Sequence, residues 1–327
     1  MDTIYIERAV KDHPQTVRIV QRYPDARKIL IDRYTAVFNV NTQNFRLQKQ
    51  NPALILAEKH DTKVLTAPPD YNIGGKHNYY FSHMMNCIYD CRYCFLQGMY
   101  NSANYVVFVN YQDFFDAITE TTNRHTEPSW YFSGYDCDSL ALEPVTLFMD
   151  ACLNYFSTHA KAHLEIRTKS TQIRSLLKRD PIDNCVIAYS LTPDPIARAV
   201  EHKTPSVQKR IEALKSLSEA GWKIGLRFDP LLNAEAFKTT YQTLFDTVFD
   251  QLDTDTIHSV STGPFRLPKP FFKKLVKLYP EEPLLADKFT QQGSLISYPV
   301  DDENDQMAWC EEQLLQHIDR DRFFPCV

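Results

Sequence analysis

The sequence predicts an α/β protein whose core is a parallel sheet, and two observations support this prediction. From about residue 78 onward, short apolar runs typical of strands alternate with longer segments of helical periodicity, as in consecutive β/α units. The chain has 327 residues, of which 43% are apolar, so it can bury a large core. A chain of this length forms either two domains or one large α/β domain.

Six strands are expected, each followed by a helical segment. They cover residues 78–85, 129–133, 163–168, 185–191, 223–228 and 256–262. A shorter run, 105–109, is expected to add extended chain between the first strand and its helix. Six such units make an incomplete barrel or an open curved sheet, with its chemistry at the carboxyl ends of the strands. Residues that directly follow a strand are therefore the main candidates for a functional site.

Three of the intervening helices carry apolar residues at core-facing spacing. These residues are Phe148, Cys152, Tyr155 and Phe156 in the first, Val207, Ile211, Leu214 and Leu217 in the second, and Phe237, Tyr241, Leu244 and Val248 in the third. Thr204 and Pro205 are expected to cap and start the second of these helices, and Gly221 to end it.

The segments outside the repeating units are expected to be extensions of one domain. Residues 1–76 form a less regular N-terminal lead-in, residues 77–265 form the partial-barrel core, and residues 266–327 form an extension that packs on the core. The last segment begins with a basic, aromatic stretch and continues into an acidic run at 301–305.

Composition excludes several classes of protein. The eight glycines form neither a dinucleotide-binding nor a P-loop pattern. No apolar run approaches the roughly 18 residues of a membrane span, and the first residues do not resemble a signal peptide. We therefore expect a cytoplasmic protein without a membrane partner. The net charge of −5 means that any binding to nucleic acid must use a local basic patch.

Three of the eight cysteines form a compact motif directly after the first expected strand. Cys87, Cys91 and Cys94 are spaced C-x3-C-x2-C. Three thiolates on one loop can ligate three irons of a 4Fe-4S cluster and leave the fourth iron open to bind a molecule and transfer one electron to it. The alternatives are a zinc site completed by His83 or Asp90, or cysteines without a metal.

The motif resembles the signature of the radical S-adenosylmethionine (SAM) superfamily, in which an aromatic residue, here Tyr93, precedes the third cysteine. The resemblance implies a radical SAM partial (β/α)6 barrel, in which the open iron chelates SAM and one electron cleaves it to a 5′-deoxyadenosyl radical. The residues that it implies around SAM are Tyr93, Ser133, Gly134, Lys169 and Ser190. Ser133 and Gly134 occupy the turn that receives the SAM amino group, and Lys169 and Ser190 end the third and fourth strands. At the end of the fifth strand, Arg227 and Asp229 are expected to form an ion pair at the cavity rim.

A longer match, over most of residues 78–265, resembles the spore photoproduct lyase family. It includes Tyr80-Phe81-Ser82-His83, Cys94-Phe95-Leu96-Gln97, Asp138-Ser139-Leu140 and Arg167-Thr168-Lys169. The resemblance implies an enzyme that repairs a thymine-thymine lesion in DNA and depends on SAM, a 4Fe-4S cluster and a reducing electron-transfer protein.

Two positions depart from the pattern of that family. Family members carry Tyr immediately after the third cluster cysteine and a hydrogen-donating Cys after the second strand, whereas this chain has Phe95 and Tyr135 there. Cys137 lies two residues later. The candidates for closing the radical cycle are therefore Cys137 and the tyrosines Tyr135, Tyr93 and Tyr100. The alternatives are that Cys137 is an ordinary turn residue and that the tyrosines are packed aromatics.

A basic and aromatic segment follows the sixth strand. Its nucleic-acid-binding candidates are Arg266, Lys269, Lys273 and Lys274, which alternate with phenylalanines. Cations with interleaved aromatic rings can hold phosphates and a flipped base, although a solvated helix face over a core has the same pattern.

Three functional hypotheses result. The first is a radical SAM lyase acting on damaged DNA. The second is a radical SAM enzyme that acts on a peptide, an RNA or a small molecule and has lost lyase activity. The third is a non-enzymatic zinc-binding scaffold.

Overall fold

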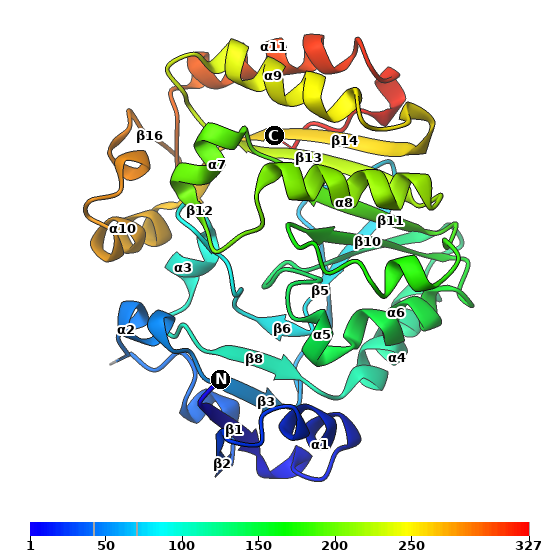
Figure 1. Cartoon of the computed structure of the whole chain (residues 1–327), viewed down its shortest axis with the longest axis vertical. Coiled ribbons are helices and arrows are strands. Elements are labelled where there is room, and N and C mark those ends of the chain that lie inside the picture. The colour runs from blue at the N-terminus through cyan, green and yellow to red at the C-terminus, as the bar shows by residue number, and fades with distance from the viewer. Residues whose placement is uncertain (42, 70, 327) are drawn as a thin grey trace.

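The computed structural model describes residues 1–41, 43–69 and 71–326, and its largest feature is a seven-stranded sheet (Figure 1). Six strands from β5 to β14 are parallel to their neighbours, and β4 pairs antiparallel with β5 at one edge. In spatial order the strands are β14 (Ile257–Pro264), β13 (Lys223–Leu231), β11 (Cys185–Ser190), β10 (Ala162–Thr168), β9 (Ser129–Ser133), β5 (His77–Phe81) and β4 (Val64–Thr66). The chain is therefore a mixed α/β protein, as predicted.

All six predicted strands are present, and the first is interrupted. β9 has the predicted bounds, whereas the predicted strand 78–85 divides into β5 and a separate short strand, β6 (Met84–Met85), in another sheet. Among the described residues the two edge strands, β14 and β4, do not pair with each other. The sheet is therefore open, and no closed barrel forms.

Helices cover one face of this sheet. The large hydrophobic core joins their apolar residues to alternate strand residues such as Leu164, Ile187 and Leu226. These helices are α4 (Tyr111–Thr122), α5 (Glu143–Thr146), α6 (Phe148–Phe156), α7 (Asp194–Val200), α8 (Val207–Glu219), α9 (Phe237–Phe249) and α11 (Val300–Leu314). Helix α8 begins two residues later than predicted, because the Ser206 side chain, not Thr204, caps it by accepting the Lys209 N–H. Gly221 follows its end with φ +86°, which favours glycine.

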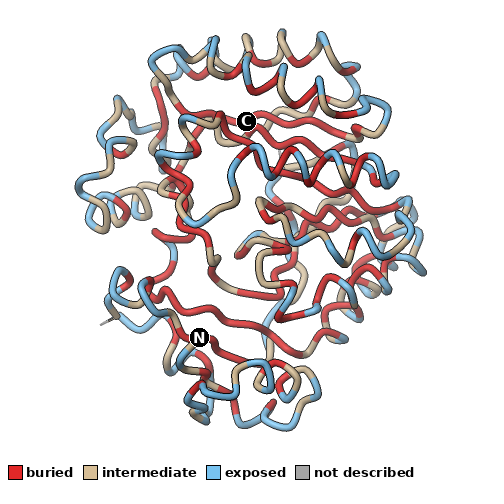
Figure 2. Tube along the Cα trace, viewed as in Figure 1, coloured by how far each residue is buried: buried red, intermediate tan, exposed pale blue. Residues whose placement is uncertain are grey.

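The N-terminal segment is more regular than the expected lead-in. Its strands β1 (Thr3–Glu7), β2 (Arg27–Ile31) and β3 (Leu54–Ala57) belong to a second sheet of order β2-β1-β3-β8-β6. It also contains the helices α1 (Pro14–Gln21) and α2 (Phe45–Gln50). The run expected to be extended chain, β8 (Tyr105–Phe108), pairs in parallel with β3. This second sheet therefore combines strands from both sides of residue 76, and Figure 2 shows β3 and β8 buried along their length.

The remaining helices and strands lie along one side of the molecule, at the left in Figure 1. They are β7 (Asp90–Cys91), α3 (Phe95–Met99), β12 (Glu201–His202), β15 (Arg266–Pro268), α10 (Lys269–Leu278), β16 (Thr290–Gln292) and β17 (Leu295–Ser297). A separate hydrophobic cluster packs Leu267, Leu275 and Tyr298 of this part against Tyr89 and Tyr93 of the cysteine loop. None of the described helices combines the length and apolar character that a membrane span requires.

Candidate active site

One cavity, of about 390 Å³, opens at the carboxyl ends of the parallel strands. It is lined by the cysteine loop, by residues that follow β9, β10, β11, β13 and β14, and by α2. Most of the predicted site residues line it, although they are far apart in the sequence. They are Cys87, Cys91, Tyr93, Cys94, Ser133, Gly134, Tyr135, Cys137, Lys169, Ser190 and Arg266.

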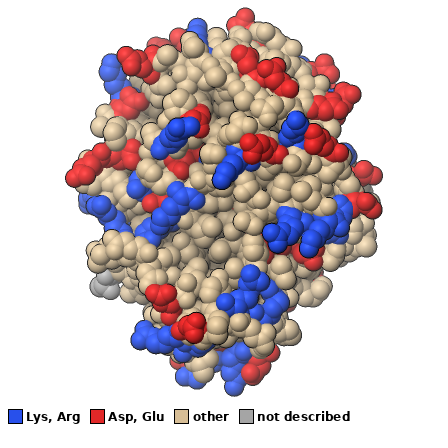
Figure 3. All heavy atoms as spheres, viewed as in Figure 1, with Lys and Arg blue, Asp and Glu red and all other residues tan. Residues whose placement is uncertain are grey.

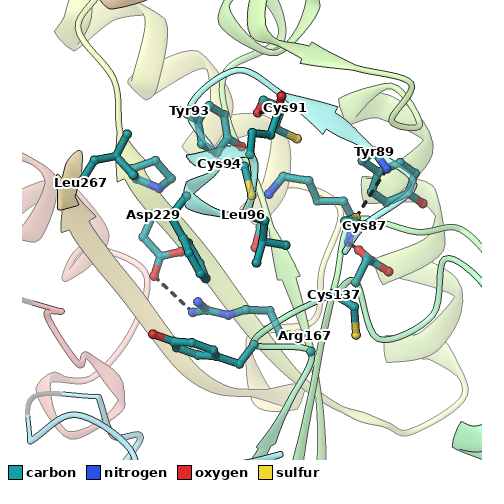
Figure 4. A pocket seen from close by; sticks show the side chains of 18 of the residues that line it. Cys87, Tyr89, Cys91, Tyr93, Cys94, Leu96, Cys137, Arg167, Asp229 and Leu267 are labelled. Atoms are coloured by element: carbon teal, nitrogen blue, oxygen red, sulfur yellow. Dashed lines mark hydrogen bonds and ion pairs between the residues drawn. The ribbon is translucent and has the colours of Figure 1, made fainter. Parts of the chain in front are cut away.

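The three cysteines of the motif lie on one wall of this cavity (Figure 4). Cys91 is in β7, which pairs with β12, and the Cys87 sulfur accepts the Tyr89 N–H at 3.4 Å. Burial raises the pKa of all three thiols, that of Cys87 to about 12. Buried thiolates therefore need a cationic ligand. Three thiols on one loop, facing one cavity, are a donor set that fits a 4Fe-4S cluster.

The same region argues against the zinc alternative. Within the described residues, no three His, Cys, Asp or Glu side chains, the motif cysteines included, are gathered as a group that could hold a metal ion, so the choice between iron and zinc rests on the proposed fourth ligands. His83 does not line the cavity; it is 1% exposed and its ring stacks on Phe148 at 4.1 Å. Asp90 pairs instead with Arg92 at 2.9 Å. Neither proposed fourth ligand is therefore directed at the cysteines.

Lys49 holds the cysteine loop from the N-terminal segment. Its Nζ donates to the carbonyl oxygens of Cys87 and Tyr89, both at 2.9 Å, and its side chain lines the cavity. Only 8% of Lys49 is exposed, and burial lowers its pKa, an effect that the nearby Asp90 carboxylate opposes. Lys49 was not predicted, because nothing local in the sequence marks a lysine that lies 38 positions before the motif.

Glu201 connects the cysteine loop to two predicted SAM-binding residues. Its carboxylate accepts a hydrogen bond from the Tyr93 hydroxyl, lies 3.8 Å from the Lys169 Nζ and pairs with the fully buried Arg210. Arg210 in turn donates to the Ser190 carbonyl at 3.3 Å. These positive partners lower the pKa of Glu201 against the effect of its burial. Glu201 and Arg210 were also missed, because most of their partners lie on distant segments of the chain.

The turn after β9 has the geometry of a ligand-binding backbone. Gly134 has φ +81°, and a Cβ there would lie 2.4 Å from the Ser139 hydroxyl, so only glycine fits. The Ser133 hydroxyl hydrogen-bonds that of Ser139 at 2.7 Å. Asp138 accepts the Lys169 N–H at 2.7 Å and thereby fixes this turn to the end of β10.

The two candidates of this turn for closing the radical cycle face different surroundings. Cys137 is 7% exposed and packs with the hydrophobic cluster of the N-terminal sheet, and Figure 4 shows its sulfur directed away from the three cysteines. Tyr135 is 37% exposed, stacks on Tyr80 and meets Phe95 in a tilted arrangement.

The ion pair expected between Arg227 and Asp229 does not form. Arg227 is buried and pairs with Glu165 at 2.7 Å, whereas Asp229 pairs with Arg167 at 3.1 Å, as drawn in Figure 4. Each of the two side chains meets a partner of opposite charge on β10 instead, Glu165 for Arg227 and Arg167 for Asp229.

The basic segment divides into residues of different character. Arg266 lines the cavity and donates to a backbone carbonyl at 2.8 Å. Lys274 donates to the carbonyl of Tyr100 at 2.6 Å, and Lys269 to a glutamine side chain. Lys273 is exposed. On the face drawn in Figure 3, basic and acidic side chains are interspersed, so Arg266 is the candidate of this segment best situated to meet a ligand in the cavity.

Comparisons with known proteins identify what this chain is similar to. A family model described as "Spore photoproduct lyase" matches residues 2–298. The spore photoproduct lyase of Bacillus subtilis (strain 168) is 24% identical over 246 residues, which are 73% of this chain and 71% of the relative. That of Clostridium acetobutylicum is 24% identical over 225 residues, 66% of each chain. A solved structure of a spore photoproduct lyase mutant with bound AdoMet and dinucleoside spore photoproduct has a TM-score of 0.85 at 17% identity and covers 100% of this chain and 98% of that chain. At that identity the structural match shows the fold.

Proposed function

The chain belongs to the spore photoproduct lyase family, and from this premise we propose that it is a radical SAM enzyme that acts on a thymine lesion in DNA. The observation that carries the proposal is that Cys87, Cys91 and Cys94 line the same cavity as Lys169 and Ser190. We infer that the six parallel strands are the partial (β/α)6 barrel of the radical SAM fold. Relatives named for this reaction support the choice of substrate.

The residues of the cavity take distinct roles in this proposal. Cys87, Cys91 and Cys94 would hold a 4Fe-4S cluster, and the chemistry that this group supplies with SAM is the formation of a 5′-deoxyadenosyl radical. Lys169 and Ser190 hold the carboxylate and ribose of SAM by charge and hydrogen bonding. The backbone at Gly134 receives the amino group, since no side chain separates it from the cavity. A reducing electron-transfer protein supplies the electron.

A second candidate function keeps the cofactors and changes the substrate to a peptide, an RNA or a small molecule. Phe95 and Tyr135 favour it, because they replace the tyrosine and the cysteine that complete the radical cycle in the family pattern. If it is correct, SAM is cleaved but the DNA lesion persists.

The first test is the composition of the anaerobically reconstituted protein. We expect the wild type to contain iron and sulfide and to form 5′-deoxyadenosine after addition of dithionite and SAM. Cys91→Ala is expected to lose the iron and sulfide and to form no 5′-deoxyadenosine. The matched control is Cys152→Ala, which removes a buried cysteine of α6 that lies in the hydrophobic core. A colourless wild-type protein that binds zinc would overturn the proposal.

A further inference from the structure

Tyr135 and Tyr80 form an aromatic step that leads out of the cavity. Their ring centroids are 4.3 Å apart with planes inclined by 29°, and Phe95 continues the series from Tyr135 at 5.4 Å. Phe95 and Tyr135 line the cavity, whereas Tyr80, on β5, does not. The three rings therefore run from the inside of the cavity to its outside.

The turn that carries the step is tied to β5, and its Tyr135 ring is partly open to solvent. Tyr135 is 37% exposed, one of the few large apolar or aromatic side chains exposed among the described residues. The neighbouring Asp136 N–H donates to the Ser82 hydroxyl at 3.1 Å and ties the turn to the end of β5. A ring that is exposed but fixed in place loses little conformational freedom when it binds a flat partner.

The charge of the cavity lining indicates an anionic ligand. The lining contains four basic residues, Lys49, Arg167, Lys169 and Arg266, and two acidic ones. This excess of positive charge occurs in a chain whose net charge is −5. A flat aromatic partner that also carries negative charge is the description of a nucleotide in a strand of nucleic acid.

We propose that Tyr135, supported by Tyr80, is a stacking platform for the nucleobase next to the nucleotide that enters the cavity. This inference rests on the proposed action on DNA and assigns Tyr135 a binding role that its ring provides, independent of its hydroxyl. Arg266, at the same cavity, is the cation that contacts the neighbouring phosphate. The sequence pattern of the family has a cysteine at this position, so the platform is a feature of this chain.

The test measures the binding of a fluorescein-labelled, single-stranded oligothymidylate to the reconstituted protein by fluorescence anisotropy. Tyr135→Ala is expected to weaken binding about 5- to 150-fold, which corresponds to about 1–3 kcal/mol for one stacked base. Tyr135→Phe keeps the ring and is expected to bind within about twofold of the wild type. The matched control is Tyr155→Ala. This variant also removes a stacked tyrosine, but one on α6 whose ring lies 5.0 Å from that of Phe115 on α4.

Two further readouts separate stacking from a general loss of structure. An oligonucleotide with 2-aminopurine beside the central thymine is expected to lose fluorescence on binding the wild type and Tyr135→Phe but not Tyr135→Ala. The slope of log affinity against log salt is expected to stay the same in Tyr135→Ala and to become shallower in Arg266→Gln, because only the latter removes a phosphate contact.

The outcomes distinguish this inference from the function on which it rests. If the wild type binds and converts damaged DNA but Tyr135→Ala binds the oligonucleotide with the affinity of the wild type, the platform is overturned and the proposed function stays intact. A wild-type protein that forms 5′-deoxyadenosine but binds no oligonucleotide would overturn both the platform and the DNA substrate.

Discussion

His83 provides a quantitative test of the core beside the site, because it was one of the two possible zinc ligands and its ring is enclosed in the core. It is 1% exposed, stacks on Phe148 with an interplanar angle of 1°, and its Nδ1 has no hydrogen-bond partner among the residues that the structure describes. Burial lowers its pKa from 6.5 to about 3. Folding therefore requires the neutral ring.

The sign and size of the effect follow from proton linkage. A base whose pKa falls on folding contributes full stability above its unfolded pKa, here 6.5, and loses it progressively as the pH drops toward 3. With 1.36 kcal/mol for each pKa unit, His83 alone should cost about 2 kcal/mol of unfolding free energy between pH 7 and pH 5. Replacement by Phe keeps a ring on Phe148 and removes the titration.

The assay is urea unfolding of wild type and His83→Phe at pH 7 and pH 5. We expect the wild type to lose about 2 kcal/mol more than the variant over this interval. The matched comparison is His317→Phe, which removes a histidine stacked on Phe249 at 4.3 Å from a partly exposed position. An equal loss in wild type and His83→Phe would refute the assignment of His83 as a neutral core residue.

The other predictions concern residues that shape the cavity. Lys49→Met leaves two carbonyls of the cysteine loop without their donor. It should lower the unfolding free energy by about 1–3 kcal/mol and also reduce the amount of iron incorporated on reconstitution. Lys49→Arg should lose less stability and less iron. Glu201→Gln leaves Arg210 buried without a carboxylate and should lower the free energy of unfolding in urea by about 3–5 kcal/mol. The double variant Glu201→Leu, Arg210→Met should recover much of this loss. Gly134→Ala should lower the unfolding free energy more than Gly293→Ala, because both glycines have positive φ but only a Cβ at Gly134 would meet a side chain, that of Ser139. A difference below about 0.5 kcal/mol between the two variants would contradict this close contact with Ser139.

Local patterns in the sequence were sufficient for the parallel sheet and for most of the cavity. Strands such as β9 and β11 are short, apolar and bounded by turns, and residues at their carboxyl ends necessarily share one edge of the sheet. The resemblance to the radical SAM superfamily implied Ser133, Lys169 and Ser190, and that geometric rule explains why they line one cavity.

Features that depend on distant pairing could not be predicted in this way. The N-terminal sheet forms because Leu54–Ala57 pairs with Tyr105–Phe108, about 50 residues later, and neither run alone indicates the other. Lys274 is a similar case, since its carbonyl partner in Tyr100 lies 174 positions away and a basic residue on a helix gives no sign of such a contact. Glu201 and Lys49 belong to the same class.

The most direct test of the central claim is the repair reaction itself. Anaerobically reconstituted, dithionite-reduced protein is incubated with SAM and an oligonucleotide that carries the spore photoproduct, and 5′-deoxyadenosine and the lesion are measured together. We expect loss of the lesion by the wild type and none by Cys91→Ala. Formation of 5′-deoxyadenosine with the lesion unchanged would contradict a DNA-repair function and favour radical chemistry on another substrate.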